Sequence, residues 1–488
     1  MSATLTNLRP WKPRRAAAAA LIALALQACG GGGGGGISGP PTVTISVNPT
    51  SVTLGQASTL TWSSTMATSC TASGAWTGSQ QTSGTQQVTP TAAGSATYTL
   101  TCTGAAGGGG PYGGGTAQSA SASATLTVNA ATPTPTAFVS KALVSNEASV
   151  ATTQDKNVVN AWGLVFAPND PVWIANNGTS TSTLYDGNGT IEQLVVTLPP
   201  DASNNAFQPT GIVAFDITTF PNDFVVTSVK AGQSTSGPSA FIYSGLGGQI
   251  AGWSPTAGIV SAYTATDKAC YRGLAIANNG TANFLYANDF VGAKIDVFDA
   301  KFAKQATTAF PFTDPNLPKG YAPFGIQAIA NGPNGTTQIY VSYAMSGTGA
   351  NQGTCEDTRG AGFGMINVFD PNGKLVKGEL VAVGGLLNAP WGMALAPKDF
   401  GTLSNALLVA NHADGTINGY DPATGALIGT LKTASGTFTQ DGLWGIAFGN
   451  DGTFSGADLH QPHNTLFFTA GPNSAANGVY GRIDLPAM

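Results

Sequence analysis

Four side chains with oxygen donors could hold a divalent cation in this chain. They are Asn288, Asp289, Asn411 and Asp441, and carboxylate and amide oxygens are the ligands that Ca²⁺ prefers. His412 follows Asn411 directly, and an imidazole is the simplest general base near neutral pH. We therefore take His412 and Asp441 as candidate catalytic residues beside a calcium ion. A structural alternative stays open, because Asn side chains often hydrogen-bond the backbone of their own turn.

A repeated pattern from residue 137 onward indicates how these side chains are positioned. Residues 160–164 (Asn-Ala-Trp-Gly-Leu) return as 388–393 (Asn-Ala-Pro-Trp-Gly-Met), and related starts contain six glycines. The repeated glycines are Gly163, Gly211, Gly273, Gly325, Gly392 and Gly445. Each unit reads as a meander of about four strands and about fifty residues. Stacking six such sheets around an axis buries the faces that one sheet leaves open, so residues 137–488 are predicted to form a six-bladed β-propeller.

Both ends of this segment are predicted to meet in one blade. Residues 143–145 (Leu-Val-Ser) precede the first unit, and the last unit ends near residues 483–485. A strand contributed by each end would close the ring and remove open sheet edges.

The start of each unit and the end of each second strand should share one face of the propeller. Asn176, Asn288 and Asn411 are predicted to end three second strands at equivalent positions. This face would hold the candidate binding residues Trp162, Asn176, Arg272, Asn288, Tyr321, Trp391, Asn411 and Trp444. The tryptophans could be stacking platforms for a carbohydrate, a peptide or an envelope protein, or they could pack the channel mouth.

The same topology predicts a disulfide. Cys270 precedes the third unit directly, and Cys355 lies in the long segment after the second strand of the fourth unit. Because both belong to one face of adjacent blades, we expect Cys270 and Cys355 to pair, with Cα atoms within about 7 Å.

Residues 1–28 read as an export signal. Basic residues up to Arg15 precede an apolar run, 16–26, that is too short to span a bilayer. Residues 26–29 (Leu-Gln-Ala-Cys) resemble the lipobox of bacterial lipoproteins. The resemblance implies a lipid anchor on Cys29 in the outer membrane or at the cell surface. Seven consecutive glycines, 30–36, follow within residues 29–40, which we interpret as a flexible tether.

Residues 41–129 alternate polar and apolar positions in short runs, a pattern typical of half-buried antiparallel strands. Cys70 and Cys102 are expected to pair in an oxidising compartment. The stretch 60–64 (Leu-Thr-Trp-Ser-Ser) with 69–74 resembles bacterial immunoglobulin-like domains, which implies a small β-sandwich that acts as an adhesion module or a spacer. Residues 130–136 read as a Pro-rich linker.

Charge excludes one class of partner. Charged residues are 9% of the chain and the net charge is -5, so the clustered lysines and arginines that neutralise phosphates are missing and nucleic acid is not expected.

The repeats resemble NHL-like propellers and, more closely, a family of secreted bacterial propellers. Six-bladed lactonases, a related group, hold calcium in the channel through Asn, Asp and Glu oxygens. No Glu occupies a matching strand end here.

The sequence thus predicts an all-β chain, with an immunoglobulin-like sandwich followed by a six-bladed propeller. Its expected function is an exported, lipid-anchored binding module that contacts the membrane through its anchor. The alternative is a calcium-dependent hydrolase or lactonase with its site at the channel mouth.

Overall fold

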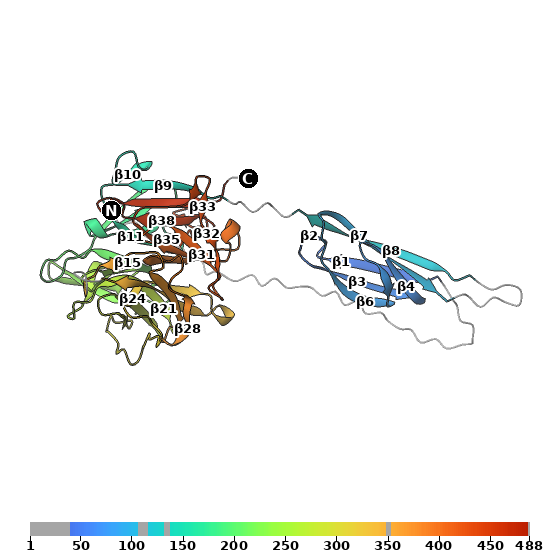
Figure 1. The fold of residues 1–488 in the computed structure, drawn as a ribbon, viewed down its shortest axis with the longest axis horizontal. Coiled ribbons are helices and arrows are strands. Elements are labelled where there is room, and N and C mark those ends of the chain that lie inside the picture. Colours follow the sequence, from blue (N-terminus) through green and yellow to red (C-terminus); the bar gives the residue numbers. More distant parts are fainter. Residues whose placement is uncertain (1–39, 106–115, 131–136, 348–352, 487–488) are drawn as a thin grey trace, which may run out of the picture. The chain divides into compact units, whose positions relative to one another are not determined.

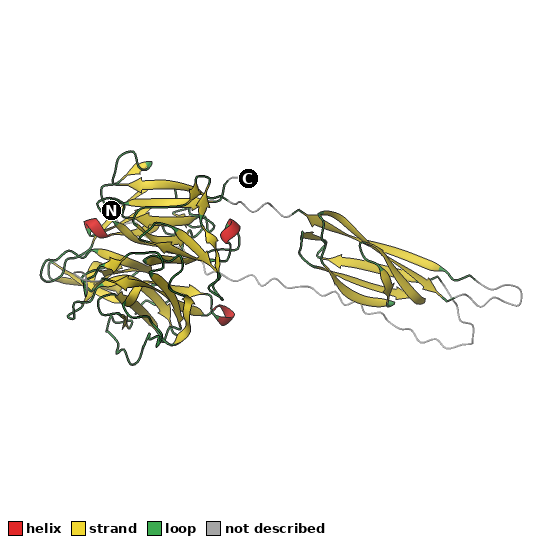
Figure 2. Ribbon diagram, viewed as in Figure 1, coloured by secondary structure: helices red, strands yellow, loops and turns green. Residues whose placement is uncertain are grey.

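The computed structural model describes residues 40–105, 116–130, 137–347 and 353–486. Cys29, the expected signal peptide, nearly all of the tether and most of the linker lie outside the described residues. The chain divides into two compact units between Pro133 and Thr134. Strands dominate both units, and the helices are single 3₁₀ turns (Figure 2). Within the described ranges, no helix is long and apolar enough to cross a bilayer.

The first unit consists of two sheets that share one core. A three-stranded sheet has the order β1-β3-β6, and a five-stranded sheet has the order β2-β8-β7-β4-β5. The strands are β1 (Thr42–Asn48), β2 (Ser51–Thr53), β3 (Ser58–Thr65), β4 (Ala67–Gly74), β5 (Gly78–Gln80), β6 (Ser83–Val88), β7 (Gly94–Gly104) and β8 (Ser119–Asn129). Alternate residues such as Leu60 and Leu100 are buried between the sheets, as the period of two requires.

Cys70 and Cys102 form the expected disulfide. They stand directly opposite each other on the paired strands β4 and β7, with Cα atoms 4.0 Å apart. Trp62 and Trp76 pack edge to face in the same core, with ring centroids 5.1 Å apart. The small unit therefore combines a covalent cross-link with an aromatic centre.

The second unit is the predicted propeller of six sheets (Figure 1). Its innermost strands are β11 (Ala161–Phe166), β15 (Pro209–Ala214), β21 (Tyr271–Asn278), β24 (Tyr321–Ala330), β29 (Pro390–Leu395) and β35 (Leu443–Phe448). The second strands are β12 (Val172–Asn176), β18 (Phe241–Gly245), β22 (Asn283–Asp289), β25 (Thr337–Ser346), β30 (Leu407–Asn411) and β38 (Leu466–Ala470). The third strands are β13 (Thr181–Tyr185), β19 (Gln249–Ser254), β23 (Lys294–Phe298), β27 (Gly364–Phe369), β31 (Ile417–Tyr420) and β39 (Val479–Asp484).

Outer strands complete most blades, and one of them closes the ring. Blades one, two, four and five end in β14 (Ile191–Thr197), β20 (Gly258–Thr264), β28 (Leu375–Val381) and β32 (Leu427–Thr430). The sixth blade takes β9 (Val139–Ser145), which pairs antiparallel with β39 and brings Ser145 opposite Val479. Figure 1 shows β9 beside the last strands of the chain. The predicted closure by both ends of the segment is confirmed.

Short strands and turns are inserted between the main strands of the propeller. They are β10 (Thr153–Gln154), the hairpin β16 (Val225–Lys230) with β17 (Gln233–Pro238), β26 (Asp357–Thr358), β33 (Lys432–Thr433) with β34 (Gly436–Thr437), β36 (Thr453–Phe454) with β37 (Ala457–Asp458), and the turns η1 (Asn177–Thr179), η2 (Pro333–Gly335) and η4 (Gly401–Leu403). The strand β26 pairs with β25 and belongs to the segment that carries Cys355.

The six repeated glycines form a ring at the centre, and each faces the innermost strand of the next blade. A Cβ added to Gly163 would lie 2.7 Å from the carbonyl oxygen of Thr210, and one added to Gly445 would lie 2.5 Å from that of Trp162. Such distances are shorter than van der Waals contact, so any larger residue would push neighbouring blades apart. Glycine is required here by close approach of the backbones.

Hydroxyl groups on second strands connect neighbouring blades at the same level. The Ser342 hydroxyl accepts a hydrogen bond from the Gly325 N–H at 3.0 Å and donates to the Pro390 carbonyl of the next blade at 2.6 Å. Thr469 makes the same pair of bonds, from the Gly445 N–H and to the Trp162 carbonyl. These bonds satisfy backbone groups that an innermost strand would otherwise leave unpaired.

Replacing Gly445 by alanine should therefore destabilise the propeller. We expect a loss of about 1–3 kcal/mol in the free energy of unfolding, because the new methyl group overpacks the ring. Urea denaturation of the full chain measures this loss. Gly429→Ala in β32 is the matched control, since the atom nearest to its added Cβ lies 3.9 Å away. Equal stability of Gly445→Ala and Gly429→Ala would contradict the close-approach argument.

Candidate functional site

The aromatic residues of the predicted binding face are packed together at one end of the channel. Trp162 stacks on Trp444 with ring centroids 3.6 Å apart, and Trp391 meets both rings edge to face. Their exposed fractions are only 3%, 3% and 9%. The expectation that they form open stacking platforms is therefore wrong, and the alternative that they pack the channel mouth holds. We call Trp162, Arg272, Phe324, Trp391 and Trp444 the aromatic plug.

Arg272 supplies the positive charge at the centre of the plug. Its guanidinium carbon lies 5.0 Å from the ring centroid of Phe324 and 5.3 Å from that of Trp162. Asp357 is the nearest carboxylate, at 3.8 Å, and its side chain is buried as well. Burial lowers the pKa of Arg272, and the charge of Asp357 opposes that shift. The rings and the carboxylate together offset the cost of burying this charge.

A segment of blade four is fastened over the plug. The predicted Cys270–Cys355 disulfide is present, with Cα atoms 5.9 Å apart. Asp357 reaches Arg272 from the same segment, and the Arg359 guanidinium lies 3.0 Å from Nε2 of His412. One covalent bond and two polar contacts therefore hold residues 355–359 against this end of the channel. Tyr321, which we expected on an open face, is also buried.

His412 is part of the same sealed arrangement. Its ring stacks on Trp444 at 3.5 Å, and its Nδ1 lies 3.2 Å from the Leu443 carbonyl oxygen. A carbonyl can only accept, so Nδ1 carries the proton, and Nε2 is left to accept from Arg359. Burial lowers the pKa of His412 to about 3, helped by the charges of Arg359 and Arg272 and opposed by Asp357. A buried imidazole with both nitrogens occupied and so low a pKa cannot act as the expected base.

The buried imidazole should make stability depend on pH. The unfolded chain binds a proton on His412 below pH 6.5, whereas the folded chain resists protonation down to about 3. The stability linked to neutral His412 is complete above pH 6.5 and is lost as the pH falls toward 3, at about 1.4 kcal/mol per pH unit. We expect His412→Gln to show a shallower loss between pH 6.5 and 4.5 in urea denaturation. Parallel curves for the two proteins would exclude this linkage.

Strand register corrects the equivalence expected among the three asparagines. Asn176 stands opposite Ala161 and Asn411 opposite Pro390, but in blade three the matching residue is Asp289, opposite Tyr271. Asn288 comes one residue earlier, where other blades hold Ser342 or Thr469. Its side-chain amide is buried and has no hydrogen-bond partner among the described residues.

The two equivalent asparagines serve local structure. The Asn176 amide donates to the Thr183 hydroxyl at 2.9 Å. The Asn411 amide donates to the Leu386 carbonyl at 2.7 Å, and its oxygen accepts from the Asn388 N–H at 3.1 Å. These hydrogen bonds agree with the structural alternative, in which each asparagine stabilises the backbone and side chains next to it.

The two candidate aspartates also have separate partners. One Asp289 oxygen accepts from the N–H groups of Cys270, at 3.0 Å, and Gly292, at 2.9 Å. Asp441 is exposed, and its carboxylate accepts from the Asn473 N–H at 2.8 Å. Asp289, Asn411 and Asp441 therefore each bind different neighbours, and no contact among the described residues joins them with Asn288 around a shared calcium ion.

A different acidic group lies in blade three, and sequence reasoning missed it. Carboxylate oxygens of Asp267, Asp289 and Asp296 lie within 4.8 Å of one another. Two ammonium groups offset most of their negative charge: Lys294 approaches all three, and Lys304 lies 2.6 Å from Asp296. Burial disfavours the charge on Lys294, but hydrogen bonds to Asp267 and Asp296 outweigh burial and raise its pKa. The lysines occupy the role that a cation would fill.

The other end of the channel is open and forms an apolar funnel of about 880 Å³. Its wall comes from the innermost strands after the glycine ring, with residues from all six blades. Half-buried rings and aliphatic groups line it, among them Phe166, Phe215, Ile276, Leu395 and Phe448. Towards the glycine ring the space narrows to a neck of about 40 Å³. This size suits a small ligand rather than a protein segment with its own fold.

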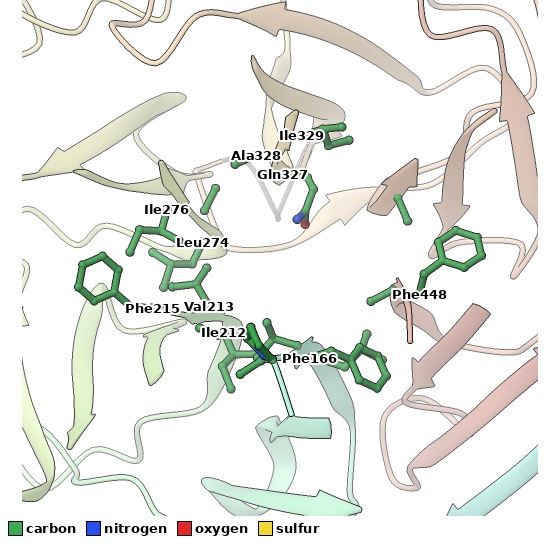
Figure 3. Close-up of a pocket in the computed structure, with 18 of the residues that line it drawn as sticks. Phe166, Ile212, Val213, Phe215, Leu274, Ile276, Gln327, Ala328, Ile329 and Phe448 are labelled. Carbon is green, nitrogen blue, oxygen red and sulfur yellow. The ribbon is translucent and has the colours of Figure 1, made fainter. Parts of the chain in front are cut away.

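One polar side chain enters the funnel from a strand. Gln327 of β24 is exposed and has no side-chain hydrogen bond within the described chain. Figure 3 shows its amide pointing into the opening, with Leu274, Ile212 and Phe448 around it. Gln327 lies two residues after its ring glycine, and the other blades place small or branched apolar residues there: Val165, Val213, Ala275, Ala394 and Ala447. Aligning the repeats by their glycines would have revealed this exception.

The fold and its two channel ends define a class: a six-bladed β-propeller that is sealed at one end by aromatic rings and open at the other. The chain is 30% identical over 354 residues to "Uncharacterized protein R648" of Acanthamoeba polyphaga mimivirus, covering 70% of this chain and 78% of that protein. It is 28% identical over 358 residues to "Uncharacterized protein L690" of the same virus, covering 70% and 84%. The chain belongs to the family of these proteins.

Solved structures with a similar fold are more distant. Virginiamycin B lyase from Staphylococcus aureus has 10% identity and a TM-score of 0.39, covering 68% of this chain and 98% of that one. A structural genomics protein of unknown function from Bacteroides thetaiotaomicron has 10% identity and a TM-score of 0.42, covering 92% and 99%. No protein-family model matches the chain. Likeness at this level transfers no activity.

Proposed function

We propose that this chain is an exported, lipid-anchored binding module whose propeller receives a small ligand in the funnel. The observation that carries the proposal is the contrast between the channel ends. The residues of the aromatic plug are buried at one end, whereas the funnel at the other is concave and lined largely by apolar side chains. Ligand sites are usually concave and apolar with a few polar groups, as this one is.

A non-catalytic role fits the funnel better than hydrolysis. Its wall holds one titratable side chain, Asp216, which is exposed and already accepts from the Thr218 and Thr219 hydroxyls. These hydrogen bonds lower the pKa of Asp216 and keep it a poor base. The alternative proposal, a calcium-dependent hydrolase or lactonase, needs a base and a shared ion. It loses support because His412 is buried and three of the four expected ligands, Asp289, Asn411 and Asp441, have other partners.

The funnel proposal predicts that filling the space removes binding. Ala447 of β35 lines the funnel, so the indole introduced by Ala447→Trp would occupy part of the funnel space. A ligand present at about a hundredfold excess over its Kd stabilises the fold by about 2.7 kcal/mol. We therefore expect compounds in a fragment library of sugars, short peptides and apolar molecules to raise the Tm of the wild-type chain but not of Ala447→Trp. Leu427→Trp, at an exposed position of β32, is the control.

The library experiment has a clear contrary outcome. If no compound raises the Tm of the wild type, or if every stabilising compound also stabilises Ala447→Trp, the funnel is not the binding site.

Export and anchoring belong to the same proposal. The lipobox-like residues ending at Cys29 support them, and two disulfides suit an oxidising compartment. Such a protein would stand at the outer membrane or cell surface of a bacterium, with the first unit between the anchor and the propeller. Whether that unit is an immunoglobulin-like spacer or an adhesion module stays a prediction.

Replacing Cys29 by serine should release the protein from the membrane. Without the thiol, no acyl chain can be attached, and each buried methylene of such a chain contributes about 0.8 kcal/mol to anchoring. In a Gram-negative host fed radiolabelled palmitate, we expect label and membrane fractionation for the wild type and neither for Cys29→Ser. Label retained in Cys29→Ser would refute this anchor site.

A further inference from the structure

We propose that the funnel selects an uncharged, largely apolar small molecule with one hydrogen-bonding group, and that Gln327 recognises that group. This inference rests on the proposed function, because it names the ligand class of the same site. It draws on the charge of the wall, the isolation of Gln327 and the way the channel is closed.

The residues that line the funnel disfavour a charged ligand. Among the described lining residues, none is Lys, Arg, His or Glu, and the one carboxylate belongs to Asp216 at the rim. A ligand anion would meet no cation and would approach Asp216, whose low pKa keeps it negative. A ligand cation would find a single, exposed carboxylate that hydroxyl groups already bind. Since transferring an ion to apolar surroundings without a partner is costly, an uncharged ligand is favoured.

Gln327 is placed to recognise one polar group. An amide offers a carbonyl acceptor and two N–H donors, and none of these is used within the described chain. The blades that hold Val or Ala at this level show that the propeller needs no polar group there. An amide surrounded by Leu274, Ile212 and Phe448 can gain a hydrogen bond from a ligand that also covers those apolar groups (Figure 3).

The channel allows the ligand one way in. Beyond the funnel, the glycine ring narrows the space to about 40 Å³, near the share of one water molecule in the liquid. The buried rings of the plug follow. A ligand therefore cannot pass through the propeller, and its apolar part must end above the ring.

N-phenylnaphthylamine is a suitable probe, because it is neutral and apolar, carries one N–H group and fluoresces when it leaves water. We expect saturable binding, one molecule per chain, to the full chain carrying Cys29→Ser, which avoids detergent. Gln327→Leu should weaken binding about two- to tenfold, the effect of one neutral hydrogen bond. The anionic relative anilinonaphthalenesulfonate should bind at least about tenfold more weakly, and Ala447→Trp should abolish the signal.

Two variants keep the result interpretable. Gln327→Leu changes an exposed side chain, so its Tm should match that of the control Leu427→Trp. Unchanged or tighter probe binding by Gln327→Leu would overturn the role of Gln327. Equal binding of the anionic dye would overturn the selection for neutral ligands, and so would absence of saturable binding by the neutral dye. If the dye fails while library compounds still bind in the funnel, this inference falls and the proposed function stands; if neither binds, both fall.

Discussion

The rest of the propeller depends on the close approach of the six innermost strands around one central axis. At that radius there is no room for a Cβ between Gly445 and the Trp162 carbonyl, or between Gly163 and that of Thr210. Glycine permits the contact, and hydroxyls such as that of Ser342 then join one blade to the next. The strand β9 completes the sixth blade by pairing with β39, so both ends of the propeller segment meet in one sheet.

The glycine ring also divides the channel into two unlike ends. On one side, the residues directly before four of the six glycines are aromatic and pack together, where they contact Arg272 and His412. On the other side the strands diverge, and apolar side chains line a space that they do not fill. Residues that line the funnel and residues that pack the other end therefore lie on the same strands, on either side of the ring glycines, and residue type alone does not distinguish them.

The main errors of sequence reasoning arose from this ambiguity. The sequence pattern places Trp162, Trp391 and Trp444 together at one end of the channel. Whether their rings stand apart or stack on one another depends on the channel radius, which the sequence pattern does not determine. Asn288 lies one residue before the level of Asn176 and Asn411, because Asp289 is the residue that ends β22 at that level. The acidic group of Asp267, Asp289 and Asp296 could not be foreseen, because Asp267 lies on a loop outside the strands.

The all-β fold, the six blades, the closure by both ends of the segment and both disulfide pairings can be predicted from the amino-acid pattern alone. Period-two patterns and repeated glycines are local consequences of strand geometry, and topology then brings Cys270 to Cys355. Which end of the channel is open follows only from the three-dimensional packing. Whether an end is open depends on the volume and orientation of the side chains that six distant segments bring to the channel axis. The sequence of any one segment does not contain this information. The same packing lowers the pKa of His412 to about 3 and leaves Gln327 exposed to the funnel.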